Sequence, residues 1–392
     1  MTSIGAALPT PTPLEVVANL LLGDVDNPAR LPPARGIGAR AALEEVIAPM
    51  LARPPCFVSF SGGRDSSAIL AVAVHVARRE GLDLPIPASN TFPGVPEADE
   101  TEWQELVLEH LGIRERAIVN ISEELDALGP IATAVLERRG VLWPGNAYMH
   151  GPVFELARGG TVLTGVGGDE LFDTRGASFV LAAHRRERPS VQSALSLAMA
   201  VTPRAIRAAV WRRRHAPAHP WLTPDGRSLV GRALAADAVR WPHRWNAAAR
   251  HWSRTRAYAA VRYALPVLAA DAGVELRNPF VEPAVLAEVV QQGGAAGFSS
   301  RSEAMAQLFG DLLPVAVLER STKAAFSASL FGPLTRAFAE AWDGSGVDER
   351  YVHPERLRRE WLAAKPDMNM VLLLQMAWLA AQRPAQPRAA SS

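Results

Sequence analysis

The amino-acid sequence predicts an α/β protein, a doubly wound parallel sheet followed by a mainly α-helical C-terminal region. Between Cys56 and Leu171, short apolar runs of strand length alternate with longer runs of helical periodicity, which is the pattern of a parallel sheet with crossover helices. After Phe172 the strand signals vanish, and residues 177–392 are rich in Ala, Arg and Leu at helical spacing. We therefore expect a ligand at the carboxyl ends of the strands in the first half.

Two helical patterns precede the sheet. They span Pro13–Leu22 and Ala39–Leu51, and the Pro- and Gly-rich link Leu31–Gly38 joins them. Four strands are then predicted at Cys56–Phe60, Ile86–Thr91, Arg116–Val119 and Thr161–Thr164. Two of the helices between them should end at Gly81 and Gly112, because glycine readily takes the left-handed conformation that closes a helix.

The second half is expected to consist of helices. Clear periodic segments are Ala257–Ala270, Arg301–Leu313 and Val371–Ala381. The predicted organisation is a helical lead-in at 1–55, an α/β core at 56–176, a mainly helical substrate region at 177–383, and a disordered tail rich in Pro, Ala and Ser at 384–392.

Composition excludes several classes of protein. A chain of 392 residues with 48% hydrophobic content can bury the cores of about two domains of ~150 residues. The net charge of +1 gives no overall attraction to nucleic acid or to an anionic membrane. The single cysteine, Cys56, excludes an internal disulfide and a thiolate zinc cluster. No apolar run reaches the roughly 20 residues of a membrane helix, so a cytoplasmic protein is expected.

The first predicted strand leads directly into a glycine-rich loop, and a helical pattern follows at once. The loop reads Ser61, Gly62, Gly63, Arg64, Asp65, Ser66 and Ser67. Two glycines let the backbone fold around an anion, and the amides of a helix N-terminus attract phosphate. The loop lacks the Gly-Lys-Ser/Thr ending of a Walker loop and is not a GxGxxG turn. The alternative is an ordinary turn capped by Asp65 or Ser66.

The fourth predicted strand also ends in a glycine-rich loop, at residues 165–172 (GVGGDELF). Loops that follow neighbouring parallel strands face a common crevice. Asp65 and Asp169 would then lie beside the same phosphates, and carboxylates tolerate phosphate only with a divalent cation between them. The pair predicts bound Mg²⁺. The alternative is that Asp169 and Glu170 only stabilise a helix N-terminus.

Four segments in this order resemble the asparagine synthetase family. Residues 61–67 match the pyrophosphate loop of N-type ATP pyrophosphatases, and residues 165–172 resemble the family's GxGxDExF loop. Residues 273–280 (GVELRNPF) resemble its GvExRxPF segment, and Leu313-Pro314 with Arg320, Lys323 and Phe326 resembles its LP…R.K..F segment. The resemblance covers roughly residues 39–335 and implies a sheet of the pyrophosphate-loop ATPase type.

The resemblance implies a ligase that cleaves ATP to AMP and pyrophosphate, captures a substrate carboxylate as an acyl-adenylate, and lets an amine attack it. It places Mg²⁺ on Asp65 and Asp169, and ATP on both loops. Ser59, Thr164 and Gly165 align with residues that hold adenine and ribose. Lys323 aligns with a lysine over the α-phosphate and the oxyanion. Four further residues would contact the substrate or support those that do: Glu170, Glu275, Arg277 and Arg301.

Lys323 is notable within this sequence itself. Of the 41 basic residues, only Lys323 and Lys365 are lysine. Because a compact ammonium fits a narrow site better than the wide fork of arginine, a lysine that survives this bias indicates a specific role. Lys365, in a polar stretch, has no such indication.

Two departures from the family determine the expected subtype. Thr2 follows Met1 where the glutamine-dependent enzymes carry a nucleophilic cysteine, so the amine should come from the substrate, another chain or free ammonia. Val166 replaces the glutamate of asparagine synthetases and the tyrosine of β-lactam synthetase, and the base must lie elsewhere. The run from Arg301 to Phe326 most resembles lasso-peptide macrolactam cyclases, although most of these keep an N-terminal domain that this chain lacks.

The expected substrate is therefore a peptide or small-molecule carboxylate, and a leader-peptide-binding protein or a protease would be a suitable partner. Two alternatives stay open, an ammonia-dependent amidotransferase with a separate glutaminase and a catalytically silent binding relative. A stretch of Trp and Arg residues could form a wall for a peptide or could belong to the core. It comprises residues 211–215 (WRRRH), Trp221, Trp241, Trp245 and Trp252.

Overall fold

A computed structural model describes residues 8–93, 95–172, 198, 201–214, 219–320 and 330–382. Its centre is a five-stranded, all-parallel sheet in the order β3-β2-β1-β4-β5. The strands are β1 (Cys56–Ser59), β2 (Ile86–Thr91), β3 (Ala117–Asn120), β4 (Thr161–Leu163) and β5 (Glu275–Arg277). The α/β fold class and the four predicted strands are confirmed.

The strand β5 corrects the expectation that no strand follows Phe172. It consists of Glu275, Leu276 and Arg277, and it pairs with β4, where Leu163 lies beside Arg277. Two of its three side chains are charged, so no apolar run marks it in the sequence. Its extended conformation is fixed by hydrogen bonding to the edge of a sheet built by the first half of the chain.

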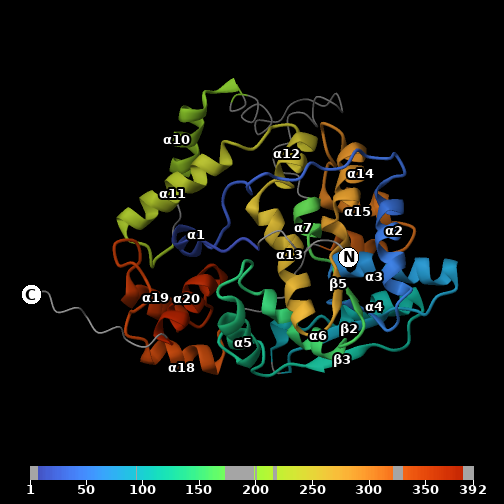
Figure 1. Cartoon of the computed structure of the whole chain (residues 1–392), viewed down its shortest axis with the longest axis horizontal. Helices are drawn as coiled ribbons and strands as arrows, with labels where there is room; N and C mark the ends of the chain where they lie inside the picture. Colours follow the sequence, from blue (N-terminus) through green and yellow to red (C-terminus); the bar gives the residue numbers. More distant parts are fainter. Residues whose placement is uncertain are drawn as a thin grey trace, which may run out of the picture.

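Helices cover both faces of the sheet, as Figure 1 shows, so the fold is doubly wound. Alternate residues of β1 reach opposite faces. Val58 packs with α2 (Ala39–Leu51), α3 (Arg64–Glu80) and α4 (Thr101–Leu111), whereas Phe57 packs with α6 (Gly151–Leu156) and α13 (Arg256–Asp271). This alternation is the period of two expected for a strand buried on both sides.

A second core lies beside the sheet region and joins helices from distant parts of the chain (Figure 1). Its helices are α1 (Pro13–Ala18), α5 (Pro130–Arg139), α11 (Pro224–Ala238), α18 (Pro333–Ala341), α19 (Pro354–Trp361) and α20 (Val371–Ala381). The remaining helices of the described residues are α7 (Gly168–Leu171), α10 (Arg204–Arg214), α12 (Trp245–Trp252), α14 (Pro283–Gly293), α15 (Arg301–Phe309) and α16 (Val315–Glu319). Short 3-10 helices are η1 (Pro96–Ala98), η2 (Ala147–His150), η3 (Pro279–Val281) and η4 (Met368–Met370).

The observed helix ends can be compared with the ends predicted from the sequence. Gly81 and Gly112 close α3 and α4 with φ values of 65° and 63°, as predicted. Helix α1 is shorter than expected, because Asn19 adopts the left-handed conformation at φ 51° and ends it at Ala18. Helix α15 likewise ends at Phe309 rather than Leu313. None of the described helices is both long and apolar enough to span a bilayer.

Candidate nucleotide site

The two glycine-rich loops lie where the strand order of the sheet reverses. From β1 the chain moves to β2 and β3 on one side, and it returns to β4 on the other side of β1. Loops that leave two such strands diverge and open a crevice at their carboxyl ends. A cavity of about 530 Å³ occupies this crevice, and residues of both loops line it.

Ser66 organises the first loop from within. Its hydroxyl accepts a hydrogen bond from the Ser61 amide (3.2 Å), lies 3.1 Å from the Ser61 hydroxyl, and donates to the Gly63 carbonyl (3.1 Å). The first residue of α3 is Arg64, and the N-cap is Gly63, which offers no capping side chain. Neither Asp65 nor Ser66 is therefore the N-cap of this helix. No side chain caps the first amides of the 17-residue helix, and amides at such a helix start can bind an anion.

The second loop packs directly on the first, and glycine makes this possible. A Cβ at Gly165 would lie 2.5 Å from the Ser66 amide nitrogen, and one at Gly168 would overlap the Asp65 carboxylate. Gly167 has φ +94°, which residues with side chains rarely adopt. Thr164 fixes the start of this loop, since its hydroxyl donates to Asn278 Oδ1 (2.6 Å) and accepts from the Val166 amide (3.2 Å).

One guanidinium joins the two aspartates that the sequence predicts to share Mg²⁺. Arg301, on α15, forms ion pairs with Asp65 through Nη2 and with Asp169 through Nη1. The two carboxylates therefore lie within the span of one arginine side chain. Asp65 Oδ1 is buried and has no hydrogen-bond partner. An acceptor-only oxygen in that position fits a hard cation such as Mg²⁺.

The donor set also suits a cation shared with phosphate. Within the described ranges, no group of three or more His, Cys, Asp or Glu residues lies close enough to hold a metal ion. Mg²⁺ is commonly bound by one or two carboxylates together with substrate phosphates and water. Asp65 and Asp169 match this pattern. The helix-dipole alternative for Asp169 and Glu170 applies only to α7, a helix of four residues.

Arginines supply the positive charge around the first loop. Arg64 lies in the loop and donates to Ser302 (3.2 Å), while Arg320 donates to the Gly62 carbonyl (3.1 Å). Burial lowers the pKa of Arg64, and the guanidinium groups of Arg301 and Arg320 lower it further against the opposing charge of Asp65. The same end of the cavity also carries the carboxylates of Asp65, Glu100, Asp169 and Glu170, so this end is rich in charges of both signs. A polyanion there can receive hydrogen bonds from arginine while a divalent cation offsets the carboxylates.

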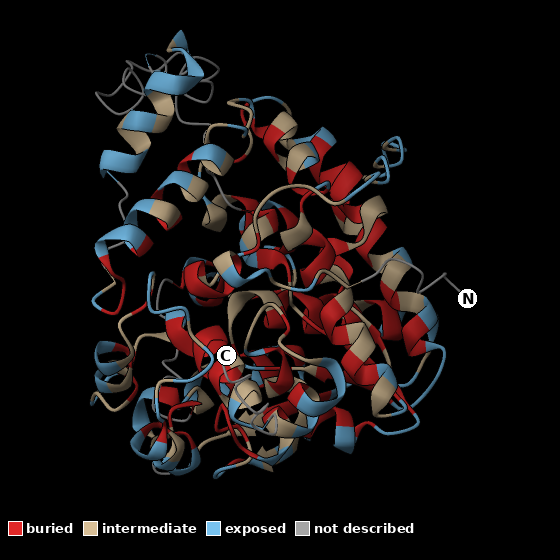
Figure 2. Ribbon diagram, turned by 60° about the vertical axis from the view of Figure 1, so that its left-hand side comes forward, coloured by how far each residue is buried: buried red, intermediate tan, exposed pale blue. Residues whose placement is uncertain are grey.

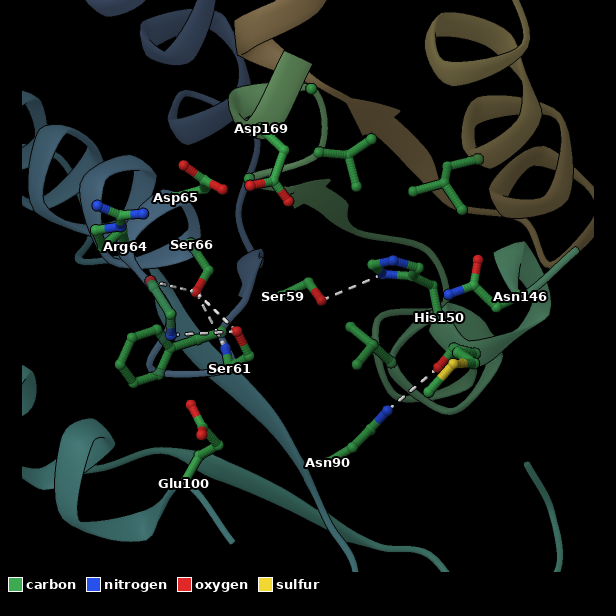
Figure 3. A pocket seen from close by; sticks show the side chains of 18 of the residues that line it. Ser59, Ser61, Arg64, Asp65, Ser66, Asn90, Glu100, Asn146, His150 and Asp169 are labelled. Carbon is green, nitrogen blue, oxygen red and sulfur yellow. Dashed lines mark hydrogen bonds between the residues drawn. The ribbon is translucent and has the colours of Figure 1, made fainter. Parts of the chain in front are cut away.

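The other end of the cavity carries neutral polar groups (Figure 3). His150 Nδ1 lies 3.3 Å from the Ser59 hydroxyl, and the Asn90 amide donates to the Met149 carbonyl (3.2 Å). Burial lowers the pKa of His150 to about 4, so its ring is neutral at pH 7. Val153 and Leu265 add apolar surface. A neutral, partly apolar end next to an end that carries arginines and carboxylates matches a nucleoside and its metal-bound phosphates.

The structure brings together most of the predicted site residues. Those that line the cavity are Ser59, Ser61, Gly63, Asp65, Ser66, Gly165, Asp169, Glu170 and Arg301. Gly62, Ser67 and Thr164 are buried behind this surface. Val166 lines the cavity with a hydrocarbon side chain. Lys323 lies outside the described residues, as does the tail at 384–392.

Glu275 and Arg277 do not line the cavity, although the Arg277 carbonyl accepts a hydrogen bond from the Thr164 amide (3.2 Å). Glu275 forms ion pairs with Arg53 and with Arg277, and neither Glu275 nor Arg277 lines the cavity. Glu275 sits at the amino end of β5, beside Thr161, whereas the glycine-rich loops follow the carboxyl ends of β1 and β4. The structure therefore does not support a substrate contact for either side chain, whereas Arg277 does support a predicted site residue, Thr164, through its backbone.

The Trp and Arg stretch does not form a wall of the cavity. Trp221, Trp245 and Trp252 are buried in the two cores, and Trp241 packs partly buried against the first. Arg212, the first arginine of the triplet, lies on α10, a helix without a buried residue. None of the described residues of the stretch lines the cavity, and the interpretation as core holds for these tryptophans.

Several residues of the site have no role predicted from the sequence. Arg64 and Arg320 occur inside matched motifs, so the motif itself was the available signal. His150, Asn90 and Gln104 lie in or next to helices and strands without any local pattern that marks them. Only the folded arrangement places them at the cavity.

Comparison with known families agrees with this geometry. The model of the asparagine synthase family matches residues 38–381, which includes both glycine-rich loops, β5 and the C-terminal helices. No curated protein matches the sequence at a significant level.

Proposed function

The chain belongs to the asparagine synthase family, and we propose that it forms an amide bond within a peptide or related specialised metabolite, as a macrolactam or isopeptide. Membership of the family supports ATP-dependent formation of a carbon–nitrogen bond. The peptide substrate and the ring closure are the proposal. The observation that carries the nucleotide chemistry is the contact between the two glycine loops, with Asp65 and Asp169 held by one arginine.

ATP would lie with its phosphates on the first loop. The amides at the start of α3 and the guanidinium groups of Arg64 and Arg301 surround that position. A loop that holds the β- and γ-phosphates as one unit makes pyrophosphate the leaving group, so attack falls on the α-phosphorus. Asp65 and Asp169 would hold Mg²⁺, which neutralises phosphate charge when it is bound.

The reaction then has two steps. A carboxylate oxygen of the substrate attacks the α-phosphorus, the bond to the β-phosphate breaks, and pyrophosphate leaves. The amine next attacks the carbonyl carbon of the acyl-adenylate, AMP leaves, and the ammonium proton is released. Donors aimed at the charge that develops in each step are each worth roughly 10²- to 10³-fold in rate. The arginines at the loop are placed for the first step.

Val166 supports an amine that belongs to the substrate. Its side chain lines the cavity and cannot accept a proton, so the acidic or phenolic group that relatives place there has no equivalent at this position. When amine and carboxylate belong to one molecule, binding converts an encounter of two reactants into an intramolecular step. The resulting effective concentration compensates for a weak base.

The test is to incubate the protein with MgATP and a panel of precursor peptides that carry Asp or Glu, and to measure pyrophosphate release and product mass. Ring closure should remove one water from a single peptide. A product in which ammonia has replaced a hydroxyl would indicate an amidotransferase instead. Binding of MgATP without pyrophosphate release, with every peptide and with ammonia, would indicate a silent relative and reject the proposal.

A further inference from the structure

We propose that Gln104 and Arg320 are positioning residues for the phosphate loop: they hold the Ser61 and Gly62 carbonyls against α4 and thereby turn the following amides toward the phosphates. The inference rests on the proposed function, because it takes this loop as the pyrophosphate site. It adds two residues that contact the loop from outside, 43 and 258 positions away in the sequence.

Gln104 is held in one orientation. Its side chain is buried, with 3% exposed, and its Oε1 accepts a hydrogen bond from Arg116 (2.8 Å). Because a guanidinium can only donate, the oxygen of the amide must face Arg116 and the NH₂ group must face the loop. That NH₂ group donates to the Ser61 carbonyl at 3.4 Å.

Arg320 makes a stronger contact with the next carbonyl. Its Nη1 donates to the Gly62 carbonyl at 3.1 Å, and its Nη2 pairs with Glu100. The guanidinium also lies 4.6 Å from the centre of the Trp103 ring. Its side chain is only 4% exposed. A lysine could not make both bonds and stack on the ring, because it lacks the planar fork of arginine.

Planar trans peptides transmit these contacts to the binding surface. In such a peptide the N–H points opposite to the preceding C=O. Carbonyls of Ser61 and Gly62 held toward α4 therefore direct the amides of Gly62 and Gly63 away from it. The Gly63 amide donates to the hydroxyl of Ser61 (3.3 Å), a residue that lines the cavity. Figure 3 shows Glu100 on one side of Ser61 and the carboxylates of Asp65 and Asp169 on the other, so the amides turn toward the carboxylate side.

The phosphate loop and helix α4 are in close contact at Gly62. Gly62 has φ +80°, and a Cβ there would lie 3.0 Å from Gln104 Cγ and 3.1 Å from the Gln104 amide nitrogen. The loop is thus pressed against the first turn of α4. Without the two donors, the peptides could rotate, and each carbonyl that turned toward the phosphates would repel them.

The experiment compares Gln104→Met and Arg320→Lys with a matched control. Gln375 is also buried, with 2% exposed, and its amide donates to the Gly145 carbonyl at 2.9 Å. The neighbours of Gly145, Pro144 and Asn146, line the cavity but do not belong to the phosphate loop. Gln375→Met therefore removes the same kind of bond elsewhere. Isothermal titration calorimetry would measure the Kd of MgATP and of magnesium pyrophosphate, and steady-state kinetics would measure the KM of the carboxylate substrate.

Gln104→Met and Arg320→Lys should each weaken both ligands by about tenfold, the usual effect of losing one hydrogen bond at a charged site. The KM of the carboxylate substrate should change less than twofold. Gln375→Met should bind magnesium pyrophosphate, which occupies only the phosphate loop, like the wild type. If Arg320→Lys does not fold, Gln104→Met decides the question alone.

Two results would overturn the inference. One is wild-type affinity in Gln104→Met. The other is an equal loss of affinity for magnesium pyrophosphate in Gln375→Met, which would indicate general destabilisation. Failure of the wild type to bind magnesium pyrophosphate or MgATP would instead reject the proposed nucleotide site and this inference with it.

Discussion

Two regions of this chain carry conspicuous residue patterns, and they have opposite outcomes in the fold. The glycine-rich loops, residues 61–67 and 165–172, converge on one cavity from two strands. The Trp and Arg stretch between residues 211 and 252 divides between buried cores and the exposed helix α10 (Figure 2). A glycine loop works through its backbone, whose conformation is local. A tryptophan side chain can either pack in a hydrophobic core or contact a ligand, and which of the two it does depends on the residues around it in the fold.

The largest effect is expected from Asp65, at the contact of the two loops. Asp65→Ala should lower pyrophosphate release at least ~10³-fold, because it removes a predicted Mg²⁺ ligand beside the phosphates. Circular dichroism should show an unchanged fold. Asp311→Ala is the control, since that aspartate is 70% exposed and pairs with Arg40 away from the cavity. Wild-type turnover in Asp65→Ala would contradict the assignment of this loop.

Lys323 lies outside the described residues, so its predicted role rests on the sequence motif alone and is tested by substitution. Lys323→Ala should reduce turnover by roughly 10²- to 10³-fold, the usual cost of losing one group that stabilises an oxyanion. Binding of MgATP should fall much less. Lys365→Ala, which alters the other lysine of the chain, should behave as the wild type in single-turnover assays.

Trp252 tests whether the tryptophans of the Trp and Arg stretch stabilise the core rather than bind a ligand. Its side chain is 6% exposed and packs edge-on against Tyr258 (5.0 Å between ring centres). Trp252→Ala should lower the free energy of unfolding by about 3 to 5 kcal/mol. Denaturant titration measures this change. The Kd of MgATP, corrected for the folded fraction, should stay within twofold of the wild-type value. A larger loss of affinity would indicate that Trp252 contributes to the ligand site.

His150 predicts a pH dependence of stability. Burial lowers its pKa to about 4, below the ordinary value of 6.5, so the unfolded chain binds more protons between these two values. The stabilising contribution of the neutral ring is present above about pH 6.5 and is lost as the pH falls toward 4. The free energy of unfolding should fall between pH 7 and pH 4 in both proteins. The fall should be smaller in His150→Gln than in the wild type, by at most about 3 kcal/mol. Equal losses would show that the ring is solvated.

The smallest effect is expected from the arginines of α10. Arg212, Arg213 and Arg214 are exposed. Replacing all three with Ala should change the free energy of unfolding by about 0.5 kcal/mol or less per residue. Thermal denaturation tests the stability. Pyrophosphate release triggered by a small carboxylate should be unchanged, and a strong loss of that activity would place α10 at the active site.

The fold was predictable to the extent that local signals were strong. The four strands at Cys56, Ile86, Arg116 and Thr161 stand out as apolar runs between helical segments, and each is found within a residue of its predicted limits. Strand β5 was not predictable, because its pairing with β4 rather than its own composition makes it extended. The predicted domain limits remain predictions.

The sequence alone determined the two glycine-rich turns, since glycine at positions of positive φ and the start of a helix are properties of neighbouring residues. The tertiary structure decided which side chains surround them. Arg301 reaches Asp65 across 236 positions, and Arg320 reaches Gly62 across 258. Contacts over such separations depend on how the helices pack, and no short pattern records that packing.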